Sequence, residues 1–147
     1  MAFQMEDQQV HDRWRKLGYE KLLLEEKDYI MIWWLIAEVN NGSFAQYFSN
    51  ETGDHALQAT NALKLSNAIQ GAKILQEALD LFLPVGGYTS NWELQNELIN
   101  KLEENCDSPH GAFREVSDAL QDADEPILGL ALANVKLAYM RHGIQEV

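Results

Sequence analysis

Residues 29–37, Tyr-Ile-Met-Ile-Trp-Trp-Leu-Ile-Ala, form the longest uninterrupted apolar run of this 147-residue chain. Apolar residues continue at helical spacing on both sides, over residues 22–39, and at the centre of this segment they surround the helix axis. A helix that is apolar on all sides has to be buried by neighbouring elements. We therefore expect this helix to form the core of the fold. Nine apolar residues are too few to cross a membrane, which takes about 20.

The flanking segments predict further helices. Before the core helix, Val10, Trp14 and Leu17 recur at helical spacing, and Gly18 follows as a stop signal. After it, the residues at 40–42, Asn-Asn-Gly, suit the left-handed conformation that ends helices. Ser43 and Gln46 then form the pattern of a capping box, which predicts a second, short helix.

The rest of the chain repeats these signals. Asp54 is placed to cap the next helix, and a break at residues 66–67 divides the apolar pattern that runs to residue 83. Ser90 with Glu93, the Ser-Pro pair at 108–109 and the Asp-Glu-Pro run at 124–126 each predict the start of another helix. No segment alternates as a strand does. The sequence predicts one all-α domain over residues 1–147, a compact bundle of about seven or eight helices.

The net charge of −12 comes from 23 acidic and 11 basic residues. Nucleic acids and anionic membranes are bound by clustered basic side chains, so this balance argues against both as direct partners. Residues 93–125 hold ten of the acidic residues and two of the basic ones. The charge therefore predicts a basic partner, and it points to this acidic segment as the place that binds it.

The acidic segment puts carboxylates on helical faces. Glu115, Asp118 and Asp122 follow the spacing i, i+3, i+7 and share one face, and Glu93 and Glu97 are one turn apart on the preceding helix. Two adjacent faces of this kind create a strong negative field that attracts a basic surface. An ordinary solvated face of an acidic protein is the competing interpretation. The predicted partner-binding residues are Glu93, Glu97, Glu104, Asp107, Glu115, Asp118, Asp122, Asp124 and Glu125.

A second polar constellation lies at residues 38–54, between two apolar helices. Its side chains could converge on a small ligand, as the floor of a pocket in a ligand-binding domain or an enzyme. Each of them also suits a helix cap or a turn, so a purely structural role is the competing interpretation. The candidate pocket residues are Glu38, Asn41, Gln46, Asn50 and Asp54.

Catalytic and metal-binding patterns are not apparent. The four histidines lie in separate elements and outside any known metal-ligand spacing, and Gly86-Gly87 lacks the partners of a phosphate-binding loop. The single cysteine, Cys106, cannot form an internal disulfide and stands beside an acidic residue that disfavours its thiolate. The sequence predicts no catalytic residue, no cofactor and no metal. Without a secretion signal at the N-terminus, a cytoplasmic protein is expected.

The segment at 38–54 reads Glu-Val-Asn-Asn-Gly-Ser-Phe-Ala-Gln-Tyr-Phe-Ser-Asn-Glu-Thr-Gly-Asp. It resembles the signature of the DNA-mimic-protein-like domain family, approximately E-V-N-N-G-G-F-x-Q-Y-F-x-N-x-x-G-D, and the resemblance covers about residues 25–83. Ser43 stands where the family usually has a second glycine. The family takes its name from an acidic, helical member that mimics duplex DNA and occupies the DNA-binding face of a transcription regulator. The resemblance implies an all-α fold and, as an expectation, such mimicry.

The leading hypothesis is therefore a non-enzymatic acidic protein that binds a basic protein, a DNA-binding regulator or a nuclease, through carboxylates that replace phosphates. The alternative is a small-molecule enzyme or ligand-binding domain built on the polar residues at 38–54. A third interpretation is a helical protein with an apolar interface, which an exposed patch around Trp92 or Phe113 favours. Self-association as a homodimer is left open.

Overall fold

The computed structural model describes residues 2–104, 106 and 111–145. Within them the chain forms seven α-helices and no strand, which confirms the predicted all-α class. No helix of this described part combines the length and the apolar character that a membrane-spanning segment needs. The helices are α1 Ala2–Leu17, α2 Leu24–Ser49, α3 Ala56–Leu65, α4 Ile69–Asp80, α5 Trp92–Glu104, α6 Arg114–Gln121 and α7 Ile127–His142.

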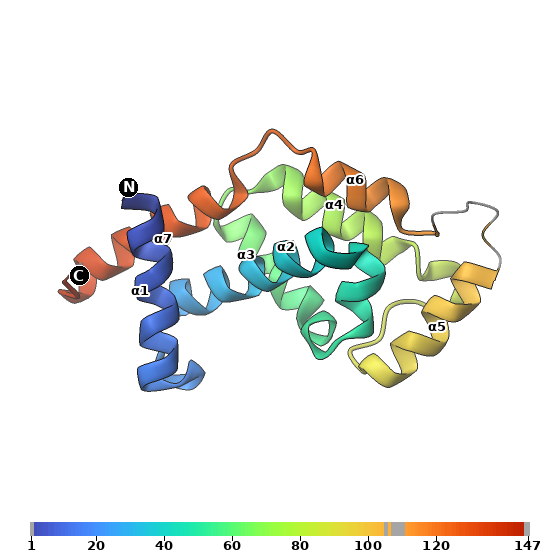
Figure 1. Cartoon of the computed structure of the whole chain (residues 1–147), viewed down its shortest axis with the longest axis horizontal. Coiled ribbons are helices and arrows are strands. Elements are labelled where there is room, and N and C mark those ends of the chain that lie inside the picture. Colours follow the sequence, from blue (N-terminus) through green and yellow to red (C-terminus); the bar gives the residue numbers. More distant parts are fainter. Residues whose placement is uncertain (1, 105, 107–110, 146–147) are drawn as a thin grey trace.

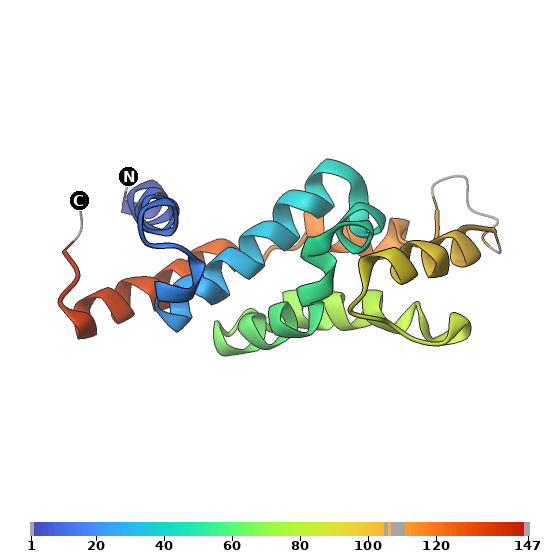
Figure 2. The ribbon, with the colours of Figure 1, turned by 90° about the horizontal axis from the view of Figure 1, so that it is seen from below.

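Helix α2 is the centre of the fold, as its apolar run predicts. It contacts α3, α5, α6 and α7, and Ile30, Ile32 and Leu35 are fully buried against them. Figure 1 shows α1 and the C-terminal part of α7 at one end of an elongated molecule and α5 at the other. In the turned view of Figure 2, α3 and α4 lie together along one side of α2. The N-terminal half of α2 thus belongs to one end of the molecule and its C-terminal half to the other.

A kink divides α2 at Gly42 and Ser43, where two separate helices were predicted. The helical course continues to Ser49, but the φ and ψ angles are −163° and 30° at Gly42 and 71° and 176° at Ser43. The Ser43 values fall in a region that is populated almost entirely by glycine. This conformation gives a physical reason for the second glycine that the family signature usually carries at this position.

Helix α6 satisfies the backbone groups that the kink leaves without helical partners. The Ser117 hydroxyl accepts a hydrogen bond from the Phe44 N–H (2.9 Å), at the start of the second half of α2. The Gln121 side-chain amide donates to the Val39 carbonyl (3.1 Å), at the end of the first half. Buried backbone polar groups need such partners. The kink is therefore held by a helix that lies more than 70 residues further along the chain.

The predicted capping boxes are partly wrong. The Ser43 hydroxyl accepts from the Ala45 N–H (3.1 Å), but the Gln46 side chain bonds elsewhere. At α5 the cap is Asn91, not Ser90: its side-chain oxygen accepts from the N–H groups of residues 93 and 94. The helix begins one residue later than predicted, which moves the capping position to the asparagine. The predicted start at residues 108–109 lies outside the described residues.

The two ends of the chain are joined by one buried carboxylate. Glu26 at the start of α2 is completely buried and accepts two hydrogen bonds from Arg13 of α1, at 2.7 and 3.1 Å. Its other partners are the Tyr139 hydroxyl of α7 (2.7 Å) and the Leu23 N–H (2.9 Å). Burial by itself raises the pKa of Glu26, but these bonds outweigh it and the pKa lies below its ordinary value.

Candidate functional site

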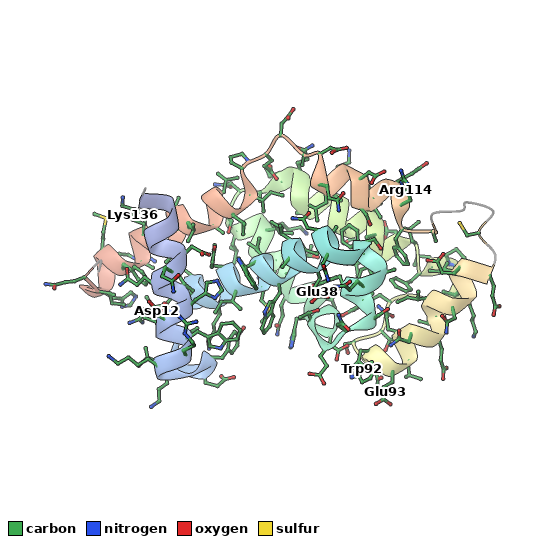
Figure 3. All side chains as sticks on the ribbon, viewed as in Figure 1. Asp12, Glu38, Trp92, Glu93, Arg114 and Lys136 are labelled. Carbon is green, nitrogen blue, oxygen red and sulfur yellow. The ribbon has the colours of Figure 1, made fainter. Side chains whose placement is uncertain are left out.

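Helix α5 exposes a row of carboxylates. It buries Gln95 and Ile99 against the rest of the molecule, which leaves the opposite face to solvent. Glu93, Glu97 and Glu104, called here the α5 carboxylates, are exposed on it. Among the described residues none of these three carboxylates has a hydrogen-bond or ion-pair partner. Figure 3 shows Glu93 at the lower edge of the view, with its side chain directed away from the ribbon.

The carboxylates of α6 are less available. Glu115 is exposed, and Asp122 is exposed at the C-terminal end of the helix. Asp118 is paired with Arg114 one turn earlier, with 3.0 Å between guanidinium Nε and carboxylate oxygen. We call Glu115, Asp118 and Asp122 the α6 carboxylates. Asp124 is exposed in the loop that follows, and Asp107 lies outside the described residues.

The two groups of carboxylates lie on different sides of the molecule. Helices α5 and α6 both pack on α2, and Figure 1 shows α6 above and α5 below its kinked half. They approach each other where Glu103 of α5 accepts a hydrogen bond from the Ala112 N–H (3.2 Å). In Figure 3, Arg114 at the start of α6 and Glu93 at the start of α5 lie at the upper and lower edges. The acidic segment thus forms two surfaces, where the sequence suggested one continuous field.

Glu125 has a structural contact that the sequence did not predict. Its two carboxylate oxygens accept hydrogen bonds from the N–H groups of Gly71 (2.9 Å) and Gln70 (3.1 Å), in the first turn of α4. A carboxylate at a helix N-terminus satisfies amides that have no helical partner and interacts favourably with the helix dipole. Glu125 therefore caps a helix that lies about 55 residues earlier in the chain.

Three of the five candidate pocket residues come together at the kink. Glu38 Oε2 accepts hydrogen bonds from the side-chain amides of Gln46 (3.1 Å) and Asn50 (2.7 Å), so it links the two halves of α2. Figure 3 shows Glu38 beside this kinked part. Asn41 is exposed. Burial raises the pKa of Asp54, which accepts a hydrogen bond from the Trp92 N–H at the start of α5.

These contacts give the signature residues a clear structural role. The polar side chains at 38, 46 and 50 bond to one another across the kink, and Gly53 is required by close packing. A Cβ atom on Gly53 would lie 2.5 Å from the Tyr47 carbonyl oxygen and 2.7 Å from the Phe48 Cα. Hydrogen bonds among these side chains are what a purely structural role of residues 38–54 predicts.

The residues proposed for an apolar interface differ in exposure. Trp92 at the start of α5 is 37% exposed, whereas Phe113 is buried at 1%. Phe113 packs against Phe82 and Phe48, with ring centroids 5.4 and 5.7 Å apart. One of the two aromatic residues therefore belongs to the core, and the other lies beside the α5 carboxylates.

Sequence reasoning missed a groove at the other end of the molecule. It has a volume of about 600 Å³. The end of α1, the N-terminal part of α2 and helix α3 line it. Asp28 lines it without a partner among the described side chains. The signal in the sequence is the spacing of residues 24, 28 and 31, which puts Asp28 on the same face of α2 as Leu24 and Met31.

A family model described as DMP19-like protein matches residues 20–141 of the chain. The matched span runs from before α2 to the end of α7, so it contains the kink and both carboxylate surfaces. Searches among curated proteins and among solved structures give no match.

Proposed function

The chain belongs to the DMP19-like protein family, and on this premise we propose that it is a non-enzymatic acidic protein that binds a basic protein as a mimic of DNA. The partner is a DNA-binding regulator or a nuclease. The α5 carboxylates carry the proposal, because they are exposed and, within the described residues, have no partners of their own. DNA-binding proteins take most of their affinity from Lys and Arg contacts to phosphates, and carboxylates can replace phosphates in such contacts.

The geometry of α5 suits this role. Glu93 and Glu97 are one turn apart, about 6 Å along the axis, and Glu104 continues the row about 10 Å further. The helix has one basic residue, Lys101, against four acidic ones. The helix backbone that carries these carboxylates is already ordered, so only their side chains have to be ordered when the partner binds, which favours affinity.

The α6 carboxylates are the second, weaker part of the proposed surface. The Arg114 guanidinium lies 3.0 Å from the Asp118 carboxylate and offsets part of its charge. Exposed pairs of this kind are weak and are screened by salt. A partner that wraps around the α5 end of the molecule can contact both surfaces. We expect neutralisation of the α5 carboxylates to weaken binding more than neutralisation of the α6 carboxylates.

Three triple variants test the proposal by capture from a native lysate at low salt, followed by elution with a salt gradient. The control removes three carboxylates at the opposite end of the molecule and therefore has the same net charge as the other two. The variants are Glu93→Gln, Glu97→Gln, Glu104→Gln for α5; Glu115→Gln, Asp118→Asn, Asp122→Asn for α6; and Asp12→Asn, Glu20→Gln, Glu25→Gln for the control.

The wild type and the control should retain the same basic protein, and the α5 variant should release it at much lower salt, because the encounter is driven by charge. Duplex DNA added to the column should displace the retained protein, since both ligands use one face of it. Equal retention by the α5 variant and the wild type, or retention that DNA does not affect, would contradict the proposal.

A further inference from the structure

The groove beside α1 has the size and composition of a ligand site. Its volume of about 600 Å³ falls within the range of small-molecule sites, roughly 300–1,000 Å³. Figure 1 shows α1 and the start of α2 at the opposite end of the molecule from α5. The groove extends from there to His55, next to Asp54, which accepts the hydrogen bond from the Trp92 N–H at the start of α5. Its lining includes Trp14, Tyr19, Asp28, Met31, Trp34 and His55.

Aromatic rings form part of its wall. Trp14 of α1 and Trp34 of α2 pack edge to face, with ring centroids 5.2 Å apart and an interplanar angle of 68°. Tyr19 lies in the 3₁₀ turn that joins these two helices. Met31 is 6% exposed and adds a buried apolar surface. The faces of indole and phenol rings attract cations, because the π electrons make them negative.

The groove already holds one cation of the chain. The Lys27 ammonium lies 5.4 Å from the centre of the Tyr19 ring and 3.9 Å from a carboxylate oxygen of Glu20. The Lys27 ammonium thus contacts both an aromatic face and a carboxylate, and it forms the ion pair of Glu20. Both its partners belong to the lining of the same groove.

The second carboxylate of the lining has no such cation. Asp28 is half-buried, and within the described residues it has neither a hydrogen bond nor an ion pair. The nearby Arg141 guanidinium donates to Glu25 instead (2.8 Å). Burial, with the neighbouring charge of Glu25, raises the pKa of Asp28 to about 6. A carboxylate that is partly desolvated and unpaired gains free energy when a cation binds beside it.

We propose that this groove binds an organic cation, an ammonium or guanidinium group carried on an apolar or aromatic body. Asp28 pairs with the charge, and the rings of Trp14 and Trp34 and the Met31 side chain contact the body. The ligand is either a free amine or the side chain of a lysine or arginine, which share this chemistry. The proposal does not depend on DNA mimicry.

Calorimetric titration of the whole chain with three probes tests the proposal and distinguishes the two sources. Phenethylamine represents a free amine, N-acetylargininamide represents a protein side chain, and 2-phenylethanol is the neutral counterpart of the first. We expect at least one of the two cations to bind about tenfold or more tightly than 2-phenylethanol, a ratio typical of a partly desolvated cation–aromatic and ion-pair contact. Whichever cation binds more tightly identifies the source.

The variant Asp28→Asn should lose about tenfold in affinity for the cation and little for the alcohol. Asp12→Asn is the matched control: it has the same net charge, and Asp12 lies on α1 outside the groove lining. It should bind as the wild type does, which excludes general attraction to an acidic protein. Equal affinity for the cations and the alcohol, or an unchanged affinity of Asp28→Asn, would overturn the proposal.

Discussion

The substitution Glu26→Gln should destabilise the protein more than any other single neutralisation of a carboxylate in α2. Glu26 is completely buried, and its carboxylate accepts four hydrogen bonds from Arg13, Tyr139 and Leu23. Glutamine has the same size but is neutral, and its NH₂ group replaces one of the two carboxylate oxygens. Both of these oxygens accept hydrogen bonds, so the NH₂ group would face N–H or O–H donors. The substitution therefore loses the ion pair and turns at least one hydrogen bond into a repulsive contact.

The expected cost follows from these contacts. Breaking one side of a buried ion pair costs about 3–5 kcal/mol. Arg13 is partly exposed, with 22% of its side chain accessible, so water compensates for some of its lost partner. We therefore expect Glu26→Gln to lower the free energy of unfolding by about 3 kcal/mol, which is roughly 6–12 °C in Tm for a domain of this size.

Urea unfolding followed by circular dichroism measures this change. The matched control is Glu25→Gln, which removes an ion pair with Arg141. The Arg141 side chain is 60% exposed and that of Glu25 26%, and ion pairs near the surface contribute about 1 kcal/mol or less. Because the pKa of Glu26 is lowered in the folded state, its stabilisation is present above the unfolded pKa near 4.5 and is lost as the pH falls below it. A Glu26→Gln protein as stable as the Glu25→Gln control would refute the reasoning.

Three further predictions concern single residues. Because burial raises the pKa of Asp28 from 3.8 to about 6, the contribution of Asp28 to stability should fall as the pH rises from 4 to 6, and Asp28→Asn should be more stable than the wild type at pH 7.5 by about 1–2 kcal/mol, after allowance for solvent screening. Urea unfolding at pH 4 and 7.5 measures this, and a pH-independent difference would contradict it. Ser43→Gly should be more stable than Ser43→Ala by about 1–2 kcal/mol, because only glycine adopts the Ser43 backbone angles without strain; thermal unfolding that ranks alanine first would count against it. Glu125→Ala should cost about 1–2 kcal/mol and speed hydrogen exchange of the Gly71 amide, whose acceptor it removes; unchanged exchange there would show that the cap is not formed in solution.

Much of the fold could be predicted from the sequence, because its signals are local. The apolar run at 29–37 identifies the central helix, since a helix without a polar face has to be buried. Gly18 ends α1 as predicted, with a φ of 85° that favours glycine. Such signals work over three or four residues, the distance over which a helix bonds to itself. These signals predict the all-α class and the helices that carry the carboxylates of the acidic segment.

The arrangement of the candidate surfaces depends on contacts between distant segments. Only the packing of α5 and α6 on opposite sides of the α2 kink separates the acidic segment into two surfaces. Likewise, the structural contact of Glu125 depends on the start of α4, where its carboxylate accepts hydrogen bonds from the N–H groups of Gln70 and Gly71. The unpaired Asp28 becomes notable only because α1 and α3 pack around it. The sequence by itself determined which side chains carry charge, whereas the tertiary structure decided which charges are paired, because pairing depends on distances that no local pattern encodes.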